Sequence, residues 1–110
     1  MIDIGSDCYQ VSVTAPGPEE ASSLGLMAVE GRLAACAQVS GPITSTYRWE
    51  GAVTQASEWL CTMKTTADRL DALMEATRAA HSYEVPEIVA TPITAGDPAY
   101  LAWIEEATRP

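Results

Sequence analysis

We predict an α+β sandwich of the ferredoxin-like type, with the element order β-α-β-β-α-β and one extra helix at the C-terminal end. Four segments have the pattern of strands, either alternating or short and apolar: 8–14, 34–49, 58–64 and 88–93. Two segments between them carry apolar residues at helical spacing, from Pro18 and from Thr66 onward. The length of 110 residues fits a single domain over 1–110, for which we expect a flexible N-terminus over 1–7.

The first strand and the first helix follow from a change of period after residue 14. Val11 and Val13 alternate with polar neighbours, which predicts a half-buried strand. Pro18 suits the first turn of a helix, because that position leaves its N–H unpaired in any case. Leu24 then lies on the apolar face of the helix, whereas Gly25 weakens it, so we expect tertiary packing to hold this helix in place.

The middle of the chain predicts two neighbouring antiparallel strands. The first is interrupted at Gly41-Pro42, where we expect a bulge, a bend or an edge position because proline cannot donate to a strand ladder. The second strand is predicted over 58–64, where large and polar side chains alternate. A turn over 50–52 begins the connection, and we expect a turn region of several residues between the two strands.

A second helix, a short strand and a final helix complete the order. Thr66 is a good N-cap, and Leu73 belongs to the apolar stripe of an amphipathic helix. Residues 88–93 form a short apolar strand, and Asp97-Pro98 starts the last helix. Right-handed crossovers place both main helices on one face of a four-stranded sheet.

The opposite face of this sheet has no main helix to cover it. Ile43, Tyr47 and Trp49 are large side chains for a surface that meets water, and Leu60 and Thr62 point away from the core. A wide apolar area with polar edges usually marks a partner surface. We therefore expect a homo-oligomer that is joined through the open sheet face and the edge strands.

Composition excludes several classes of function. The 15 acidic and 6 basic side chains leave a net charge of −9, so nucleic acid is not expected as a partner. No run of about 18 apolar residues and no signal-peptide pattern occurs, which favours a cytoplasmic protein with no membrane partner. The three cysteines form no C-x-x-C pair. A single histidine and the absence of phosphate-binding glycine motifs argue against an enzyme.

Six segments resemble the CutA family, the divalent-cation tolerance proteins, in the order of that family. They are Thr14-Ala15-Pro16, Arg32 to Ala37, Tyr47-Arg48-Trp49-Glu50-Gly51, Lys64-Thr65, His81 to Ile88, and Tyr100 to Ile104. The resemblance implies a ferredoxin-like subunit in a tight homotrimer built by strand pairing, with a cytoplasmic role in metal tolerance. It also implies kinship of shape with PII-like signalling trimers, which bind small ligands between subunits.

The chain departs from some members of the family at positions that concern copper. Val13 stands where some members have a cysteine, and Ala80 stands where some have the first of two histidines. Ser82 replaces the usual proline after the remaining histidine. A copper site assembled from those cysteine and histidine side chains would lack most of its ligands here.

Three residues are candidate metal ligands. His81 is the only imidazole, and the alternative is a structural histidine that bonds a carbonyl at a helix C-terminus. Cys36 offers a soft thiolate for Cu(I), and the alternative is an inert, buried thiol. Glu84 would add a carboxylate close to His81 in the sequence.

Five residues are candidates for a ligand cleft between subunits. They are Trp49, Lys64, Tyr83, Glu84 and Glu87. Lys64 stands before the N-terminus of the second helix, where an ammonium group and free backbone N–H groups suit an anion. Alternatively, Lys64 forms a structural ion pair with Glu84 or Glu87.

Three hypotheses about function remain. The first is a trimeric, non-catalytic divalent-cation tolerance protein that binds copper or another divalent cation and requires no cofactor. The second is a PII-like sensor that binds an anionic metabolite in a cleft between subunits. The third is a purely structural assembly whose partner is another protein.

Overall fold

The computed structural model describes residues 7–110, and it confirms the predicted order of elements. The flexible segment expected over 1–7 falls, apart from Asp7, outside the described residues. The elements are β1 (Cys8–Ala15), α1 (Pro18–Glu30), β2 (Cys36–Trp49), β3 (Ala52–Thr66), α2 (Ala67–Ala80), β4 (Ile88–Pro92) and α3 (Pro98–Ala107). None of the helices described between residues 7 and 110 is long and apolar enough to cross a membrane.

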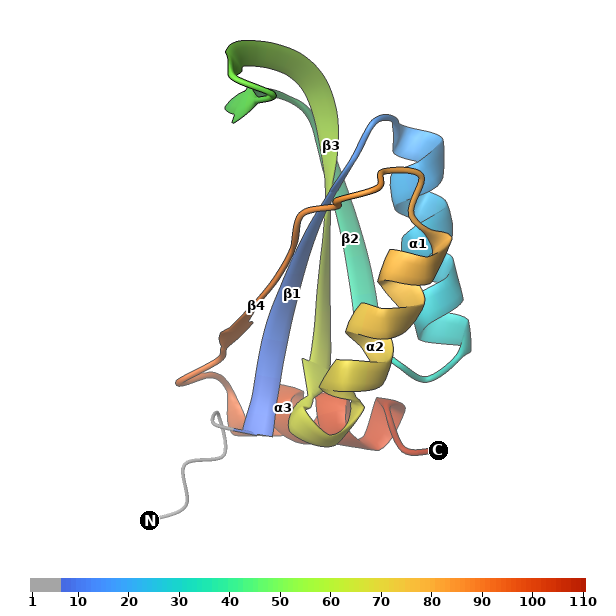
Figure 1. Cartoon of the computed structure of the whole chain (residues 1–110). Coiled ribbons are helices and arrows are strands. Elements are labelled where there is room, and N and C mark those ends of the chain that lie inside the picture. Colours follow the sequence, from blue (N-terminus) through green and yellow to red (C-terminus); the bar gives the residue numbers. More distant parts are fainter. Residues whose placement is uncertain (1–6) are drawn as a thin grey trace.

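The four strands form one antiparallel sheet in the order β2-β3-β1-β4, the ferredoxin-like arrangement. Both α1 and α2 pack against the same face of this sheet, as Figure 1 shows. Right-handed crossovers from β1 to β2 and from β3 to β4 put the two helices on one side. The sheet therefore has edge strands β2 and β4, of which β2 is much the longer.

The main core lies between this helical layer and the sheet. It consists of Val11, Val13, Ala15, Ala21, Leu24, Ala28, Ala34, Cys61, Met63 and Leu73. Helix α1 approaches the sheet closely at Gly25, where an added Cβ would stand 2.7 Å from the Cβ of Ala37. The glycine that weakens the helix thus permits the close packing that holds it.

The β2–β3 hairpin is longer and tighter than the sequence predicted. No turn of several residues separates the strands, because Glu50 and Gly51 alone connect them, with φ of +50° and +84°. Positive φ at both positions is the type I′ turn, which matches the twist of paired strands. The sequence does not predict residues 52–57 as a strand, because their apolar and polar side chains do not alternate. The interruption expected at Gly41-Pro42 is confirmed as a register shift and a cis peptide bond.

Helix α3 covers one end of the sheet face opposite α1 and α2. Cys8 is three residues before Val11, so its side chain points to the opposite face of β1, where it packs with Ala35, Leu101 and Ile104. Figure 1 shows α3 crossing below the lower end of the sheet. The expectation of an uncovered face is therefore correct only for the part of the sheet that lies away from α3.

Large apolar side chains remain exposed on the strands of the single subunit. They are Val39, Ile43, Tyr47, Trp49, Val53 and Val89. The predicted exposure of Ile43, Tyr47 and Trp49 is thus confirmed. Scattered single residues of this kind are ordinary, but this set lies on β2, β3 and β4 together.

Candidate functional site

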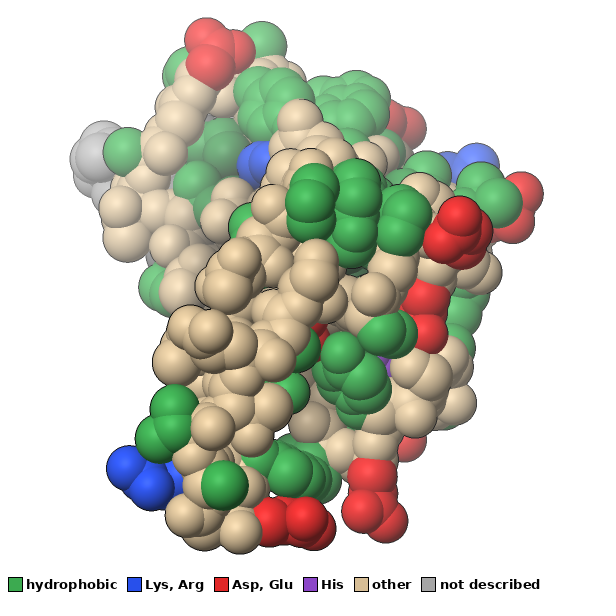
Figure 2. Space-filling model, turned by 90° about the horizontal axis from the view of Figure 1, so that it is seen from above, with side chains coloured by type: hydrophobic (Ala, Val, Ile, Leu, Met, Phe, Trp, Pro, Cys, Tyr) green, Lys and Arg blue, Asp and Glu red, His purple; other side chains and the backbone are tan. Residues whose placement is uncertain are grey.

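A groove of about 700 Å³ lies where the β2–β3 hairpin faces the loop between α2 and β4. It is lined by Thr14, Ser45, Thr46, Tyr47, Trp49, Glu58, Ser82, Tyr83, Glu84, Val85 and Glu87. Figure 2 looks down on this end of the molecule, where green hydrophobic and red acidic side chains lie interspersed. Four of the five residues predicted for a ligand cleft, all except Lys64, therefore share one groove.

The groove is acidic. Glu58, Glu84 and Glu87 contribute three carboxylates, and none of the lining residues, all within 7–110, is Lys or Arg. Glu58 is only 6% exposed, and its Oε2 accepts a hydrogen bond from the Tyr83 hydroxyl at 2.8 Å. Desolvation and this bond to Glu58 raise the pKa of Tyr83 to about 12. The phenol therefore stays protonated and donates to the carboxylate at neutral pH.

His81 is a buried, fully bonded residue beside this groove. Its Nε2 donates to the Thr14 carbonyl at 2.7 Å, and its Nδ1 accepts the Tyr83 N–H at 3.0 Å. This pattern requires the neutral tautomer with the proton on Nε2. Nδ1 also lies 3.4 Å from the Glu20 carboxylate. Both ring nitrogens are thus engaged within the subunit, as the structural alternative for His81 expects, although its carbonyl partner is on β1 and not in the helix.

The Glu20 carboxylate joins the same cluster from α1. It accepts the Ser82 N–H at 2.9 Å. Partial burial alone would raise the pKa of Glu20, but the hydrogen bonds from Ser82 lower it below its ordinary value. The first turn of α1 and the end of α2 are therefore held together by polar contacts at this end of the sheet.

Cys36 lies in another part of the subunit. Its Sγ is 3.6 Å from the Tyr100 hydroxyl of α3, and this bond raises the pKa of Tyr100. Cys36 stands in the strand row of Lys64 and Gln10, whereas His81 bonds Thr14, four residues further along β1. Four strand residues span about 13 Å. Cys36 and His81 of one subunit therefore do not meet at a common metal ion.

Lys64 is also remote from the groove. Its ammonium group donates to the Gln38 side chain on the neighbouring strand at 3.2 Å. The alternative of an ion pair with Glu84 or Glu87 is wrong for the subunit, because β3 carries Lys64 to the row of Gln10, away from these residues. Within residues 7–110, no three His, Cys, Asp or Glu side chains are grouped as a metal site requires.

Comparison with known proteins decides the family. The family model of the CutA1 divalent ion tolerance protein matches residues 9–107. The chain belongs to the CutA family. This confirms the resemblance found in the sequence, and the family is one of tolerance proteins, not of enzymes.

Individual members of the CutA family agree over almost the whole chain. The divalent-cation tolerance protein CutA of Thermus thermophilus is 44% identical over 98 residues, which cover 89% of this chain and 95% of that protein. A solved structure of the Thermus thermophilus divalent cation tolerance protein CutA1 has a TM-score of 0.90 over 93% of this chain and 99% of that one, at 42% identity. CutA of Xylella fastidiosa has a TM-score of 0.92 at 34% identity, over 94% of this chain and 100% of that one. The mouse protein CutA is 41% identical over 88% of this chain, which spans 55% of its length.

Sequence reasoning missed Glu58, the most buried carboxylate of the CutA groove. The sequence feature that could have indicated Glu58 as a site residue is its position, because an acidic side chain stands next to Trp59 at the start of an alternating apolar strand. Tyr47 belongs to one of the segments that resemble the family and was expected to be exposed, but it was not among the residues predicted for the cleft, yet it lines the groove with Trp49. Both omissions have one cause: the groove depends on how the hairpin faces the loop over 82–87, which the sequence does not specify.

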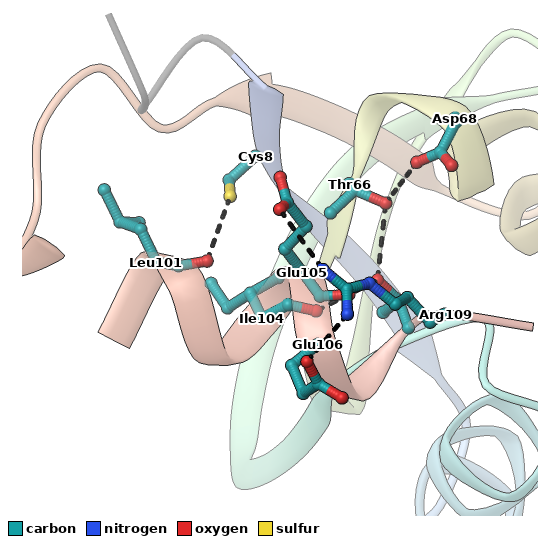
Figure 3. A network of polar contacts seen from close by, with 9 residues as sticks. Cys8, Thr66, Asp68, Leu101, Ile104, Glu105, Glu106 and Arg109 are labelled. Carbon is teal, nitrogen blue, oxygen red and sulfur yellow. Dashed lines mark hydrogen bonds and ion pairs between the residues drawn. The ribbon is translucent and has the colours of Figure 1, made fainter. Parts of the chain in front are cut away.

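A second hollow of about 410 Å³ lies between the start of α2 and the end of α3. Its polar groups bond to one another (Figure 3): the Thr66 hydroxyl contacts Asp68 at 2.6 Å and Thr108 at 3.4 Å. Arg109 pairs with Glu106 at 2.9 Å and reaches Glu105 at 4.0 Å. The contact between Thr66 and Thr108 therefore links the start of α2 to the end of α3, whereas the ion pairs of Arg109 lie at the end of α3 itself.

Proposed function

We propose that this chain forms a homotrimer that binds divalent cations without catalysis, as part of divalent-cation tolerance, and requires no cofactor. The observation that carries the proposal is the family match over residues 9–107. The Thermus thermophilus and Escherichia coli relatives bear the name divalent-cation tolerance protein. Copper is the first cation to test, with other divalent ions beside it.

The charge of the groove supports a cationic ligand. Carboxylate oxygens are the donors on offer at Glu58, Glu84 and Glu87, and divalent cations accept such donors. His81 would have to release a bond to Thr14 or Tyr83 before it could bind a metal ion. We therefore assign the cation to the carboxylates first, with Glu84 as the predicted ligand, and expect another subunit to complete the site.

Cys36 supplies the one predicted soft ligand, at some distance from the groove. Its thiol is half-buried and bonded to Tyr100, so Cu(I) binding there would be a separate event from cation binding at the carboxylates. A loss of copper binding in Cys36→Ser alone would place copper at the thiol. An unchanged titration in that variant would exclude it.

The subunit surface supports assembly into a trimer. The 14-residue strand β2 is an edge strand with several exposed apolar side chains, and Val53 on the neighbouring strand β3 is exposed too, whereas the exposed Val89 lies on β4 at the opposite edge. Long edge strands with exposed apolar residues readily pair with another chain. A second copy covers such a surface by repeating the same contact around a closed ring.

A cytoplasmic location stays part of the proposal. One similar structure, from Archaeoglobus fulgidus, is described as a periplasmic divalent cation tolerance protein, and an Arabidopsis thaliana relative as chloroplastic. The names of relatives therefore differ in compartment. Fractionation of cells with an antibody against the chain would decide the location.

Isothermal titration with Cu(II) and Zn(II) tests cation binding. The double variant Glu84→Gln/Glu87→Gln removes two groove carboxylates, and Glu19→Gln/Glu30→Gln removes the same charge from the exposed side of α1. We expect affinity to fall about tenfold or more in the first variant, which corresponds to a loss of about 1.4 kcal/mol or more of binding free energy. Equal losses in both variants would mean that only the overall negative charge attracts the cation, and would contradict the proposal.

A PII-like sensor of an anionic metabolite is the second candidate. One groove contains four of the residues predicted for a ligand cleft, which are Trp49, Tyr83, Glu84 and Glu87. However, none of the residues that line the groove in the single subunit is a Lys or Arg that could pair with an anionic ligand. This candidate requires Lys64 of another subunit to enter the groove. Binding of a phosphate-bearing metabolite that disappears in Lys64→Ala would support it. No heat with such metabolites would exclude it.

A further inference from the structure

The β2–β3 hairpin has two faces of different chemistry. Tyr47 and Trp49 are two residues apart on β2, so their side chains point to the same face, and both line the groove. Arg48 stands between them and does not line the groove, because its side chain points to the other face. Its cross-strand partner there is Val53, which is 64% exposed. The hairpin therefore carries aromatic rings on one face and a guanidinium group beside an apolar side chain on the other.

Opposite charges on this part of the subunit do not meet within one copy. Arg48 is exposed and makes no ion pair with any residue between 7 and 110. Glu84 and Glu87 at the groove are exposed as well, and neither pairs with a basic side chain of the described residues. The hairpin directs Arg48 away from its own groove, so a second copy is the nearest source of a carboxylate for it.

The composition of the groove suits an arginine. A guanidinium group donates to carboxylates through parallel N–H groups and also stacks on aromatic rings. The groove offers exposed carboxylates at Glu84 and Glu87 together with Trp49, which is 48% exposed. One guanidinium does not neutralise the three carboxylates that line the groove, so negative charge remains there for a divalent cation.

We propose that Arg48 of one copy enters the groove of the next copy, where it pairs with Glu84 and Glu87 and stacks on Trp49. The contact joins two different surfaces of the subunit, and contacts of this kind repeat around a closed ring. The inference rests on the homotrimer of the proposed function. It adds which side chains hold neighbouring copies together, and that a neighbouring copy supplies the positive charge that the groove lacks.

Charge reversal tests the proposal. Arg48→Glu and Glu84→Arg/Glu87→Arg each place like charges at the contact, and the triple variant with all three changes restores opposite charges. Arg78→Glu is the matched control, because it makes the same change of charge on the exposed side of α2, outside the groove. Sedimentation equilibrium is run at a urea concentration that partly dissociates the unmodified chain, so that the dissociation constant of every variant is measurable.

We expect Arg48→Glu and Glu84→Arg/Glu87→Arg each to raise the dissociation constant about tenfold or more, because a charge pair at an interface is replaced by repulsion. Arg78→Glu should change it by about twofold at most, since exposed ion pairs contribute little. The triple variant should return to within about threefold of the unmodified chain, because effects of contacting residues are not additive. Loss of either side chain for a purely structural reason would not be rescued in this way.

Two outcomes would overturn the inference and leave the trimer in place. The first is an effect of Arg48→Glu no larger than that of Arg78→Glu. The second is a triple variant that assembles no better than the variants that carry only one side of the change. An unmodified chain that is monomeric without urea would instead contradict the trimer of the proposed function, and the inference with it.

Discussion

Gly25 determines how closely α1 approaches the sheet. The sequence presents it only as a helix-weakening residue, and the structure gives the compensating reason, because an added Cβ would meet Ala37 at 2.7 Å and Cys61 Sγ at 3.5 Å. Both neighbours belong to strands of the sheet and have little freedom to move. A single hydrogen atom in place of a methyl group thus keeps one helix in contact with β2 and β3.

Gly25→Ala should destabilise the protein despite the better helix propensity of alanine. Overpacking costs about 1–3 kcal/mol and the propensity gain offsets about 1 kcal/mol, so we expect a net loss of up to about 2 kcal/mol. Urea unfolding measures it. Ser23→Ala, on the exposed side of the same helix, is the control and should be neutral or slightly stabilising. A more stable Gly25→Ala variant would show that α1 can move away from the sheet.

Tyr83 links stability to alkaline pH. Its pKa of about 12 in the folded chain exceeds the value near 10 of an unfolded tyrosine. The folded state therefore holds the proton more tightly, so this contribution is complete below about pH 10 and is lost as pH rises from about 10 to 12. Tyr83→Phe should flatten the stability profile over that window, and the phenolate absorbance should lose its step near pH 12. Tyr47→Phe should leave that step in place.

At the scale of elements, the β2–β3 hairpin is the part that the sequence described least well. The pattern predicted both strands, but not that β3 begins at Ala52, because residues 52–57 carry no apolar alternation. Their pairing follows from the two-residue turn at Glu50-Gly51, which sets the register with residues 44–49. Turn geometry here extends a strand through residues whose own propensity is weak.

Gly51→Val should disturb this turn. The φ of +84° at Gly51 is unfavourable for a β-branched residue, although no other atom lies within 4 Å of the added Cβ. The expected cost is about 1–2 kcal/mol, seen as a lower melting temperature. Gly51→Asn should lower it less, since asparagine tolerates positive φ. An unchanged melting temperature for valine would mean that the turn adopts another conformation.

The sequence predicts the helices and strands better than it predicts which residues meet at the candidate site. Local patterns predict β1, α1, α2 and β4, since each has its own period and its own ends. The site depends on long-range placement: the sequence offers Lys64 and Glu84 as partners for an ion pair, yet the strand row of Lys64 lies away from the groove. Trp49 and Tyr83 meet because the hairpin faces the loop after α2, a relation that no local pattern contains.

At the scale of the whole molecule, the sheet is covered by α1 and α2 on one side and by α3 at one end of the other side (Figure 1). What remains is a surface of exposed apolar residues on β2, β3 and β4 and a projecting hairpin. Burial of such a surface against other copies would remove it from water at roughly 25 cal/mol per Å². The central claim is that further copies of this chain provide that cover.

Substitutions on the two sides of the subunit test whether copies of the chain meet through the strands and the hairpin, or whether any added surface charge weakens the assembly. Val53→Asp places a charge on the hairpin, and Leu26→Asp places one on the outer side of α1; the two residues are 64% and 59% exposed in the subunit. We expect Val53→Asp to weaken the assembly and Leu26→Asp to leave it intact, because burying an unpaired charge at an interface is costly. Chromatography with light scattering compares them. Equal behaviour would place the contact elsewhere.

Sedimentation equilibrium of the unmodified chain at micromolar concentration tests the account most directly. The account predicts a single species of three times the subunit mass of 11.7 kDa. A species of the subunit mass alone would contradict it, because the exposed strands and the hairpin would then face water, and the cation site would have to be complete within one subunit.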